Sequence, residues 1–148
     1  MFSIDDVDDE AEFEMTLQCM KNVHFTDQEI AQILDVVVAI LNIGNVEFGN
    51  LKDDTVGPAS QSKEFLTTAC NLLQIDMGML IKSLTTKQQK IAKEVIETSL
   101  SLDQAYQERD SMCKHLYSQV FSWIVQKVNA AISVQGKGGS SMKSKKSG

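Results

Sequence analysis

Aspartates crowd the first ten residues, and their spacing comes close to that of a calcium-binding loop. Asp6 and Asp8 would stand at alternate ligand positions, but Glu10 breaks the pattern and Ala11 occupies the place of the glycine that lets such a loop turn. Acidic side chains are also favourable at the start of a helix, where they face the positive end of its dipole. We therefore expect a helix that begins near Asp8 rather than a metal site.

The thiol and imidazole side chains show no spacing typical of a metal site, a disulfide framework or a catalytic pair. Cys19, Cys70 and Cys113 lie far apart, each inside an apolar helical pattern, which predicts three buried small apolar side chains. His24 and His115 are not paired with a nearby nucleophile or ligand. The sequence thus predicts no catalytic residue and no metal ligand, and it does not favour a small enzyme.

A phosphate-binding loop of the pattern G-x-x-x-x-G-K-[ST] is not found in the sequence. Gly136 and Lys137 come nearest to it, but Ala131 stands at the first glycine position and Gly138 at the hydroxyl position. Phosphoryl transfer needs backbone amides, a lysine and a magnesium-binding hydroxyl around the phosphates. We therefore expect no cofactor-binding residue and no ATPase activity in this chain by itself.

Residues 85–99 form the most polar internal segment, with three lysines, one of them next to Glu94. Its few apolar residues predict a small hairpin or an extended loop. The simplest interpretation of this segment is a solvated surface loop without a specific function.

Composition is that of one ordinary globular domain, with 43% hydrophobic and 23% charged residues in 148. The net charge of −6 includes four lysines and no acid in residues 136–148, so the body of the chain is acidic and nucleic acid is not an expected partner. Residues 136–148 are rich in Gly, Ser and Lys and predict a flexible tail or loop after a domain of residues 1–135. No membrane span or signal peptide is indicated, which fits a cytoplasmic location.

Apolar periodicity and few breakers predict a mainly α fold with four shorter helices, one long C-terminal helix, and little or no sheet. The expected helices cover residues 8–22, 26–43, 65–73, 76–84 and 101–132. Capping boxes begin the second helix, at Thr26 and Glu29, and the last, at Ser101 and Gln104.

Several details of these elements are also expected. In the first helix, a buried stripe is predicted for Phe13, Leu17 and Met20, with Cys19 as a further candidate. The second helix is apolar on nearly every side, which predicts central burial, and Gly44 fits a left-handed cap at its end. A short extended piece around Val46 and Phe48 and a polar loop at residues 50–62 should follow.

The long helix of residues 101–132 has one continuous apolar face. Its members recur at three- and four-residue steps: Tyr106, Cys113, Leu116, Val120, Ile124 and Val128. A helix of this length runs about 48 Å, whereas a compact domain of this size is about 30 Å across. Tyr117, Phe121 and Trp123 add apolar surface on other sides. We therefore expect a helix that leans on further protein, and an isolated chain that self-associates or is marginally stable.

Five motifs in this order resemble the myosin motor (head) domain. Residues 40–48, ILNIGNVEF, are similar to the family pattern I-L-x-L-G-N-I-x-F, and residues 104–129 are similar to its long run that contains RDALAK and WLV. The other three are residues 4–13 (IDDVDDEAEF), residues 25–29 (FTDQE), and residues 72–86, which begin LLQI and end LTT. The resemblance covers about residues 4–133.

The resemblance implies a helical part of a P-loop motor domain, corresponding to its upper actin-binding subdomain. The intact parent would be an actin-activated ATPase that uses ATP and magnesium, moves along actin filaments and belongs to the cytoplasmic cytoskeleton. Segments like the family's two nucleotide switches are not found in this sequence. The implied partners are the actin filament and the remaining parts of the motor domain. A stand-alone helical interaction module without motor activity is the alternative.

The resemblance also implies an actin-contact loop within residues 87–98. The family carries an acidic or phosphorylatable residue sixteen positions before the aspartate of RDALAK, and Glu94 holds that position relative to Asp110. A fixed acid implies binding that needs no phosphorylation there. The arginine often found six positions before the acid is replaced by Gln88. The implied contact residues are Lys87, Gln88, Lys90, Lys93 and Glu94.

Overall fold

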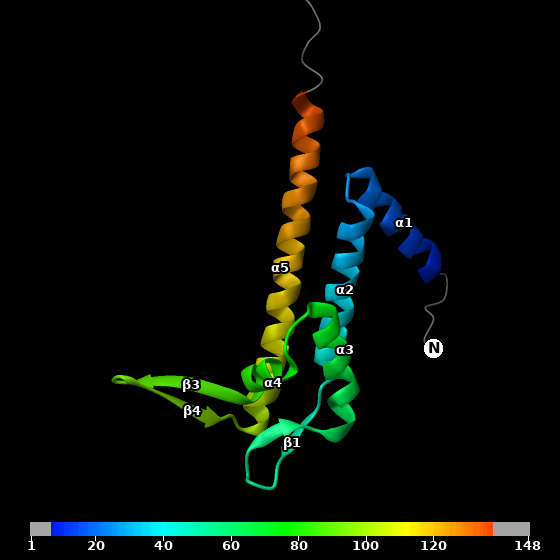
Figure 1. Cartoon of the computed structure of the whole chain (residues 1–148). Coiled ribbons are helices and arrows are strands. Elements are labelled where there is room, and N and C mark those ends of the chain that lie inside the picture. Colours follow the sequence, from blue (N-terminus) through cyan, green and yellow to red (C-terminus); the bar gives the residue numbers. More distant parts are fainter. Residues whose placement is uncertain (1–6, 138–148) are drawn as a thin grey trace, which may run out of the picture. The chain divides into compact units, whose positions relative to one another are not determined.

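The computed structural model describes residues 7–137 and separates them into two compact units (Figure 1). Unit 1 contains residues up to 32 and from 121 onward, and unit 2 contains residues 33–120. The elements are α1 (Asp9–Asn22), α2 (Asp27–Gly44), β1 (Phe48–Asn50), β2 (Val56–Pro58), the 3-10 helix η1 (Ser60–Ser62), α3 (Lys63–Leu73), α4 (Met77–Thr85), β3 (Thr86–Ile91), β4 (Glu94–Ser99) and α5 (Leu102–Lys137). Within the described residues, the predicted fold of four shorter helices and one long C-terminal helix is confirmed.

The long helix α5 is unbroken over 36 residues. Its predicted capping box is present: the Ser101 amide donates to Gln104 Oε1 (3.0 Å), and the Gln104 amide donates to Ser101 Oγ (3.3 Å). All six residues of the predicted face are half-buried, four of them in unit 2 and Ile124 and Val128 in unit 1. The helix includes the first two residues of the predicted tail, Gly136 and Lys137, and residues 138–148 lie outside the described part of the chain.

In unit 1, local signals set the helix starts as predicted. Asp8 caps α1 by accepting a hydrogen bond from the Ala11 amide (3.1 Å). Thr26 and Glu29 form the capping box of α2, with bonds of 2.8 and 3.1 Å. None of the described helices, in either unit, has a stretch long and apolar enough to cross a membrane.

The predicted buried stripe of α1 is wrong. Phe13 is 48% exposed, Leu17 and Met20 are only half-buried, and Cys19 is exposed. Exposure of this extent means that the described residues cover that side of the helix only in part. Helical periodicity identifies which side chains share a face, but it does not show that a neighbour is present to bury them.

Trp123 packs on the turn between α1 and α2, in unit 1. Its ring meets that of Phe25 edge-on, with centroids 5.8 Å apart. The Lys127 ammonium lies over both rings and pairs with Glu29, whose pKa is lowered mainly by that bond. This cluster fastens α5 to the start of α2.

We predict that Trp123→Ala lowers the free energy of unfolding by about 1–2 kcal/mol, less than the ~3–5 kcal/mol typical of a fully buried large aromatic side chain. The reason is that the indole ring is 41% exposed and so gives up only part of its area. Chemical denaturation checks this value. Val134→Ala is the control, because Val134 is on the same helix and 74% exposed. Equal losses in the two variants would contradict the packing.

The core of unit 2 is built where α3, α4 and the start of α5 meet the short β1–β2 sheet. Leu66 and Cys70 of α3, and Leu80 and Leu84 of α4, stand four residues apart and so present one side of each helix. The remaining buried members of this cluster are Val46, Phe48, Val56 and Ala105. A second buried cluster joins α2 to α3 through Ala39, Ile43 and Ala69.

Two further predictions for unit 2 are wrong. Val37, Val38 and Leu41 are 38–63% exposed, so this part of α2 is buried on one side only. Gly44 is not left-handed, because no glycine of the described chain has a positive φ. Instead, the Asn45 amide donates to the carbonyls of Leu41 and Asn42, a tightening that any residue allows.

The predicted polar loop at residues 50–62 contains β2 and η1. β2 pairs antiparallel with β1, and Val56 is buried. Ser62 is fully buried because its hydroxyl accepts from the Glu47 amide (2.8 Å) and donates to the Glu47 carbonyl (3.2 Å). Among the cysteines, Cys70 is buried as predicted and Cys113 is half-buried.

Candidate functional site

The segment that holds the predicted contact residues is an antiparallel hairpin of unit 2. Strands β3 and β4 pair from Thr86 with Ser99 at the root to Ile91 with Glu94 at the tip. Ala92 and Lys93 form the turn, and Ala92 has a φ of 57°, as a tight hairpin turn requires. Figure 1 shows the hairpin extending away from α4. The predicted small hairpin is therefore present and is longer than expected.

The strand register divides the predicted contact residues between two faces. Successive residues of a strand point to opposite faces, and directly paired residues share one. Lys87 and Glu94 therefore share one face, and Gln88 and Lys90 share the other, whereas Lys93 lies in the turn. The Lys87 face consists of Lys87, Gln89, Ile91, Glu94, Ile96 and Thr98. The Gln88 face consists of Thr86, Gln88, Lys90, Val95, Glu97 and Ser99.

A set of polar contacts joins the Gln88 face to α4. The Lys82 ammonium pairs with the Glu97 carboxylate at 2.5 Å, and Gln88 donates to the same oxygen at 3.1 Å. These two partners, Lys82 foremost, lower the pKa of Glu97. The hydroxyl of Thr86 donates to the Lys82 carbonyl (2.7 Å). Because both charged side chains are about half exposed, the ion pair adds direction more than stability.

The backbone fixes the root of the hairpin as well. The Leu100 amide donates to the Thr85 carbonyl (2.8 Å), and the Leu100 side chain is buried. The Val56 amide of β2 donates to Ser99 Oγ (3.2 Å). The root of the hairpin is thus fixed to the body of unit 2, while its outer part is exposed.

Sequence reasoning missed two kinds of residue in this site. Lys82 and Glu97 were not expected to meet, because their pairing depends on the strand register. Three apolar side chains of the hairpin are also 41–56% exposed: Ile91, Val95 and Ile96. Exposed apolar side chains that are surrounded by lysines and acidic residues provide surface that a protein partner could bury.

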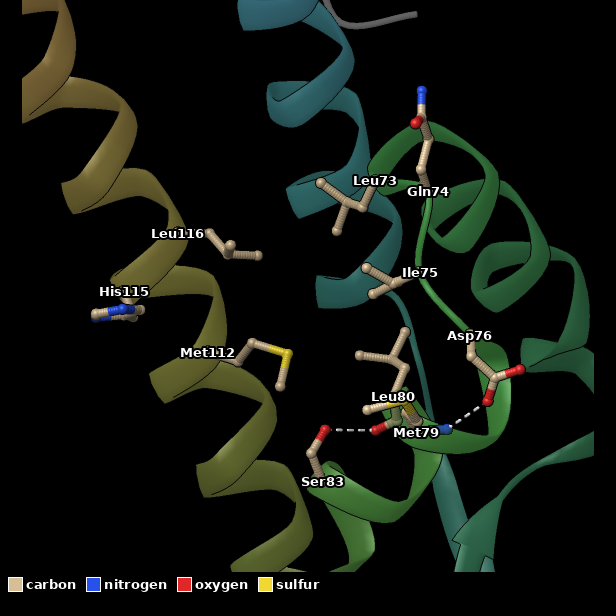
Figure 2. A pocket seen from close by; sticks show the side chains of 10 residues that line it. All are labelled: Leu73, Gln74, Ile75, Asp76, Met79, Leu80, Ser83, Met112, His115 and Leu116. Carbon is tan, nitrogen blue, oxygen red and sulfur yellow. Dashed lines mark hydrogen bonds between the residues drawn. The ribbon is translucent and has the colours of Figure 1, made fainter.

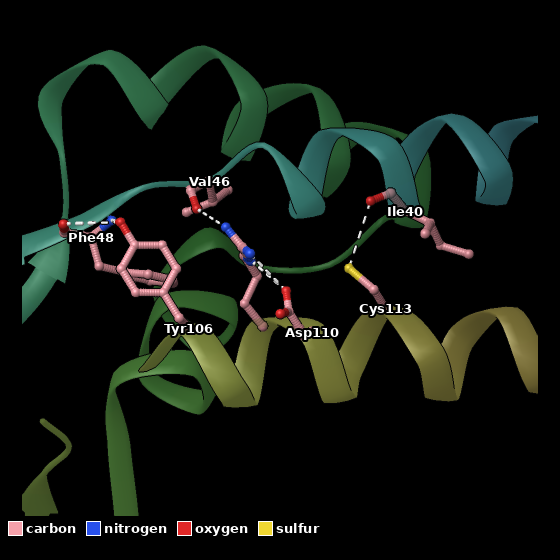
Figure 3. A network of polar contacts seen from close by, with 7 residues as sticks. Ile40, Val46, Phe48, Tyr106, Asp110 and Cys113 are labelled. Atoms are coloured by element: carbon pink, nitrogen blue, oxygen red, sulfur yellow. Dashed lines mark hydrogen bonds and ion pairs between the residues drawn. The ribbon is translucent and has the colours of Figure 1, made fainter. Parts of the chain in front are cut away.

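Two other constellations of unit 2 are structural. In Figure 3, Tyr106 of α5 reaches Phe48 at the start of β1. The Tyr106 hydroxyl accepts from the Phe48 amide (3.2 Å), and Arg109 donates to the Val46 carbonyl (3.0 Å). The Cys113 thiol donates to the Ile40 carbonyl (3.7 Å). These bonds hold α5 against its neighbours and engage the side chains of Tyr106, Arg109 and Cys113, so none of the three is free to react.

An apolar cavity of about 810 Å³ lies between the α3–α4 connection and α5 (Figure 2). Two of its polar neighbours are already engaged: Asp76 caps α4 through the Met79 amide (2.9 Å), and Ser83 donates to the Leu80 carbonyl (2.8 Å). His115 points away from the cavity in Figure 2. The cavity therefore lacks the convergent polar groups that orient a substrate. Residues 7–137 also hold no group of three or more His, Cys, Asp or Glu side chains that could bind a metal ion.

Comparison with known proteins gives consistent matches over most of the chain. The family model described as myosin head (motor domain) matches residues 1–143. Unconventional myosin-Ib of Rattus norvegicus is 34% identical over 140 residues, 90% of this chain and 12% of that protein. Myosin ID heavy chain of Dictyostelium discoideum is 35% identical over 138 residues, covering 88% and 12%. Myosin-13 of Arabidopsis thaliana is 37% identical over 131 residues, covering 87% and 9%. The chain thus spans 12% or less of the length of these three relatives.

Proposed function

The chain belongs to the myosin head (motor domain) family, and we propose that it supplies part of the face by which a myosin motor binds the actin filament. What supports the proposal is the β3–β4 hairpin, a projecting and firmly based element with Glu94 beside its turn. By the sequence resemblance alone, this segment corresponds to the family's actin-contact loop. In the intact parent, actin-activated ATP hydrolysis with magnesium would be carried by other segments. The parent would act in the cytoplasm, on the actin cytoskeleton.

The chemistry of the hairpin suits a charged filament. Three lysines and Glu94 are exposed around Ile91, Val95 and Ile96. Mixed charge at the edge of an interface orients a partner and speeds encounter, whereas apolar side chains contribute affinity when a partner covers them. The fixed root, together with the contacts of Glu97 to Lys82 and Gln88, restricts the arrangement of these groups, which lowers the entropy lost on binding.

We also propose that remaining parts of the motor cover apolar surface that this chain leaves open. In unit 2 this surface includes Val38 and Leu41 of α2, which are 43% and 63% exposed. In unit 1 it includes Ile132 and Val134 of α5, at 59% and 74%. Removing such exposed apolar side chains from water lowers the free energy, so a covering segment would be bound favourably. The same surface would drive self-association of the chain when it is alone.

The test of actin binding is Glu94→Lys, measured by co-sedimentation of the 148-residue chain with filamentous actin. We predict that the dissociation constant rises about tenfold, because a reversed charge meets the group that Glu94 attracts. Glu108→Lys is the control, since Glu108 is an exposed acid on α5 outside the hairpin and changes the net charge equally. Equal affinity of the Glu94→Lys variant and the unchanged chain for the filament would reject Glu94 as a contact residue. Filament binding that no hairpin variant changes would favour the alternative, a stand-alone interaction module.

A further inference from the structure

We infer that the filament is bound by the Lys87 face of the hairpin, and that Lys82 and Glu97 hold the opposite face toward the body of unit 2. This inference rests on the proposed actin-binding function. It adds which side of the hairpin meets the partner and which residues set its direction.

The contacts of the two faces differ. The Gln88 face is tied to the body by three side chains: Glu97 to Lys82, Thr86 to the Lys82 carbonyl, and Ser99 to the Val56 amide. On the Lys87 face, among the residues that the structure describes, the one side-chain bond is that of Thr98 to the Lys87 carbonyl (3.4 Å), which stays inside the hairpin. A partner therefore finds one face interrupted by contacts with α4 and β2, and the other open from root to tip.

The open face has a defined pattern of chemistry. Ile96, at 41% exposure, lies between Lys87 near the root and Glu94 at the tip, and Ile91, at 56%, stands directly across from Glu94. Lys87 and Ile91 are four residues apart on one strand, which is about 13 Å. The matching surface on a filament would be an apolar patch that covers Ile91 and Ile96. It would carry an acidic group that meets Lys87 and, about 13 Å away, a basic group that meets Glu94.

Lys82 and Glu97 are positioning residues in this arrangement. A two-stranded ribbon held only at its root is free to swing unless side chains brace it. The Lys82–Glu97 pair, reinforced by Gln88, joins the ribbon to α4 at the third residue pair from the root, so it fixes the direction of the Lys87 face. Neither residue needs to touch the filament to affect binding.

The closing experiment compares matched substitutions on the two faces of the hairpin by co-sedimentation of the 148-residue chain with filamentous actin. Lys87→Ala and Ile96→Ala, on the open face, are expected to weaken binding about fivefold or more. Lys90→Ala and Val95→Ala, on the other face, remove a similar charge and a similar apolar side chain and should change binding less than twofold. Equal losses on both faces, or larger losses on the Gln88 face, would overturn the inference while leaving actin binding intact. Absence of binding by the unchanged chain would instead overturn the proposed function, and this inference with it.

The positioning role has a readout that does not involve actin. Spin labels at Lys93 and at Glu64 of α3, both exposed, report the distance between the hairpin tip and the body of unit 2. Lys82→Ala should broaden that distance distribution, and the exchanged pair Lys82→Glu with Glu97→Lys should narrow it again. A distribution unchanged by Lys82→Ala would show that the backbone alone directs the hairpin and would overturn the role of the ion pair.

Discussion

Replacement of Leu84 by alanine is expected to lower the free energy of unfolding by about 3 kcal/mol. Leu84 is fully buried at the centre of the unit 2 cluster, together with Leu66, Leu80 and Val46. Removing three carbon atoms from such a site loses their transfer free energy and leaves a cavity that rigid neighbours fill only in part. A cost of this size is a large share of the stability of an ordinary domain, about 5–15 kcal/mol.

The measurement is urea denaturation followed by circular dichroism, with Met79→Ala as the matched control. Met79 lies on the same helix, α4, but is 72% exposed, so its truncation should cost less than about 1 kcal/mol. The ratio between the two variants tests the burial directly, because helix propensity changes similarly in both. A loss at Leu84 no larger than that at Met79 would mean that α4 presents a different side to the core.

The helices could be predicted from the sequence because their determinants are local. The capping boxes at Thr26 and Ser101 involve residues three apart, and each forms the predicted bonds. The apolar face of α5 follows from the 3.6-residue period in the same way. Such features depend only on residues that are close together in the sequence.

Burial could not be predicted in the same way, because it depends on which elements meet. Phe13 and Leu41 belong to apolar helical patterns, as Leu84 does, yet they are 48% and 63% exposed while Leu84 is buried. The chain spans 12% or less of the relatives it matches, and a face that periodicity marks as apolar is covered only if a neighbour is present. The sequence alone therefore predicted too much burial in α1 and α2.

The candidate site shows the same division. Motif spacing selected residues 87–98 as the contact loop, and the structure describes this segment as exposed, with the lysines and Glu94 on it. Which of them share a face depends on the register of β3 with β4, and a shift by one residue would exchange the faces. The brace of Lys82 and Glu97 depends on that register as well, so no sequence pattern marked it.

Arg109→Ala is the second substitution for which we expect a large effect, a loss of about 2–3 kcal/mol in the free energy of unfolding. The Arg109 side chain is only 18% exposed. It donates to the carbonyl of Val46, a fully buried residue, and its guanidinium lies 4.9 Å from the centre of the Tyr106 ring. Truncation leaves that carbonyl without its hydrogen bond and removes the apolar stem that packs beside Tyr106.

Two companion variants separate the parts of this effect. Arg109→Lys keeps the charge but not the planar fork that serves Val46 and Asp110 together, so it should recover only part of the loss. Asp110→Asn should cost less than about 1 kcal/mol, because Asp110 is 54% exposed and its ion pair is screened by solvent. If Asp110→Asn were as costly as Arg109→Ala, the ion pair would be the source of the stability. If only Arg109→Ala is costly, the bond to Val46 is what holds α5 against the chain between α2 and β1.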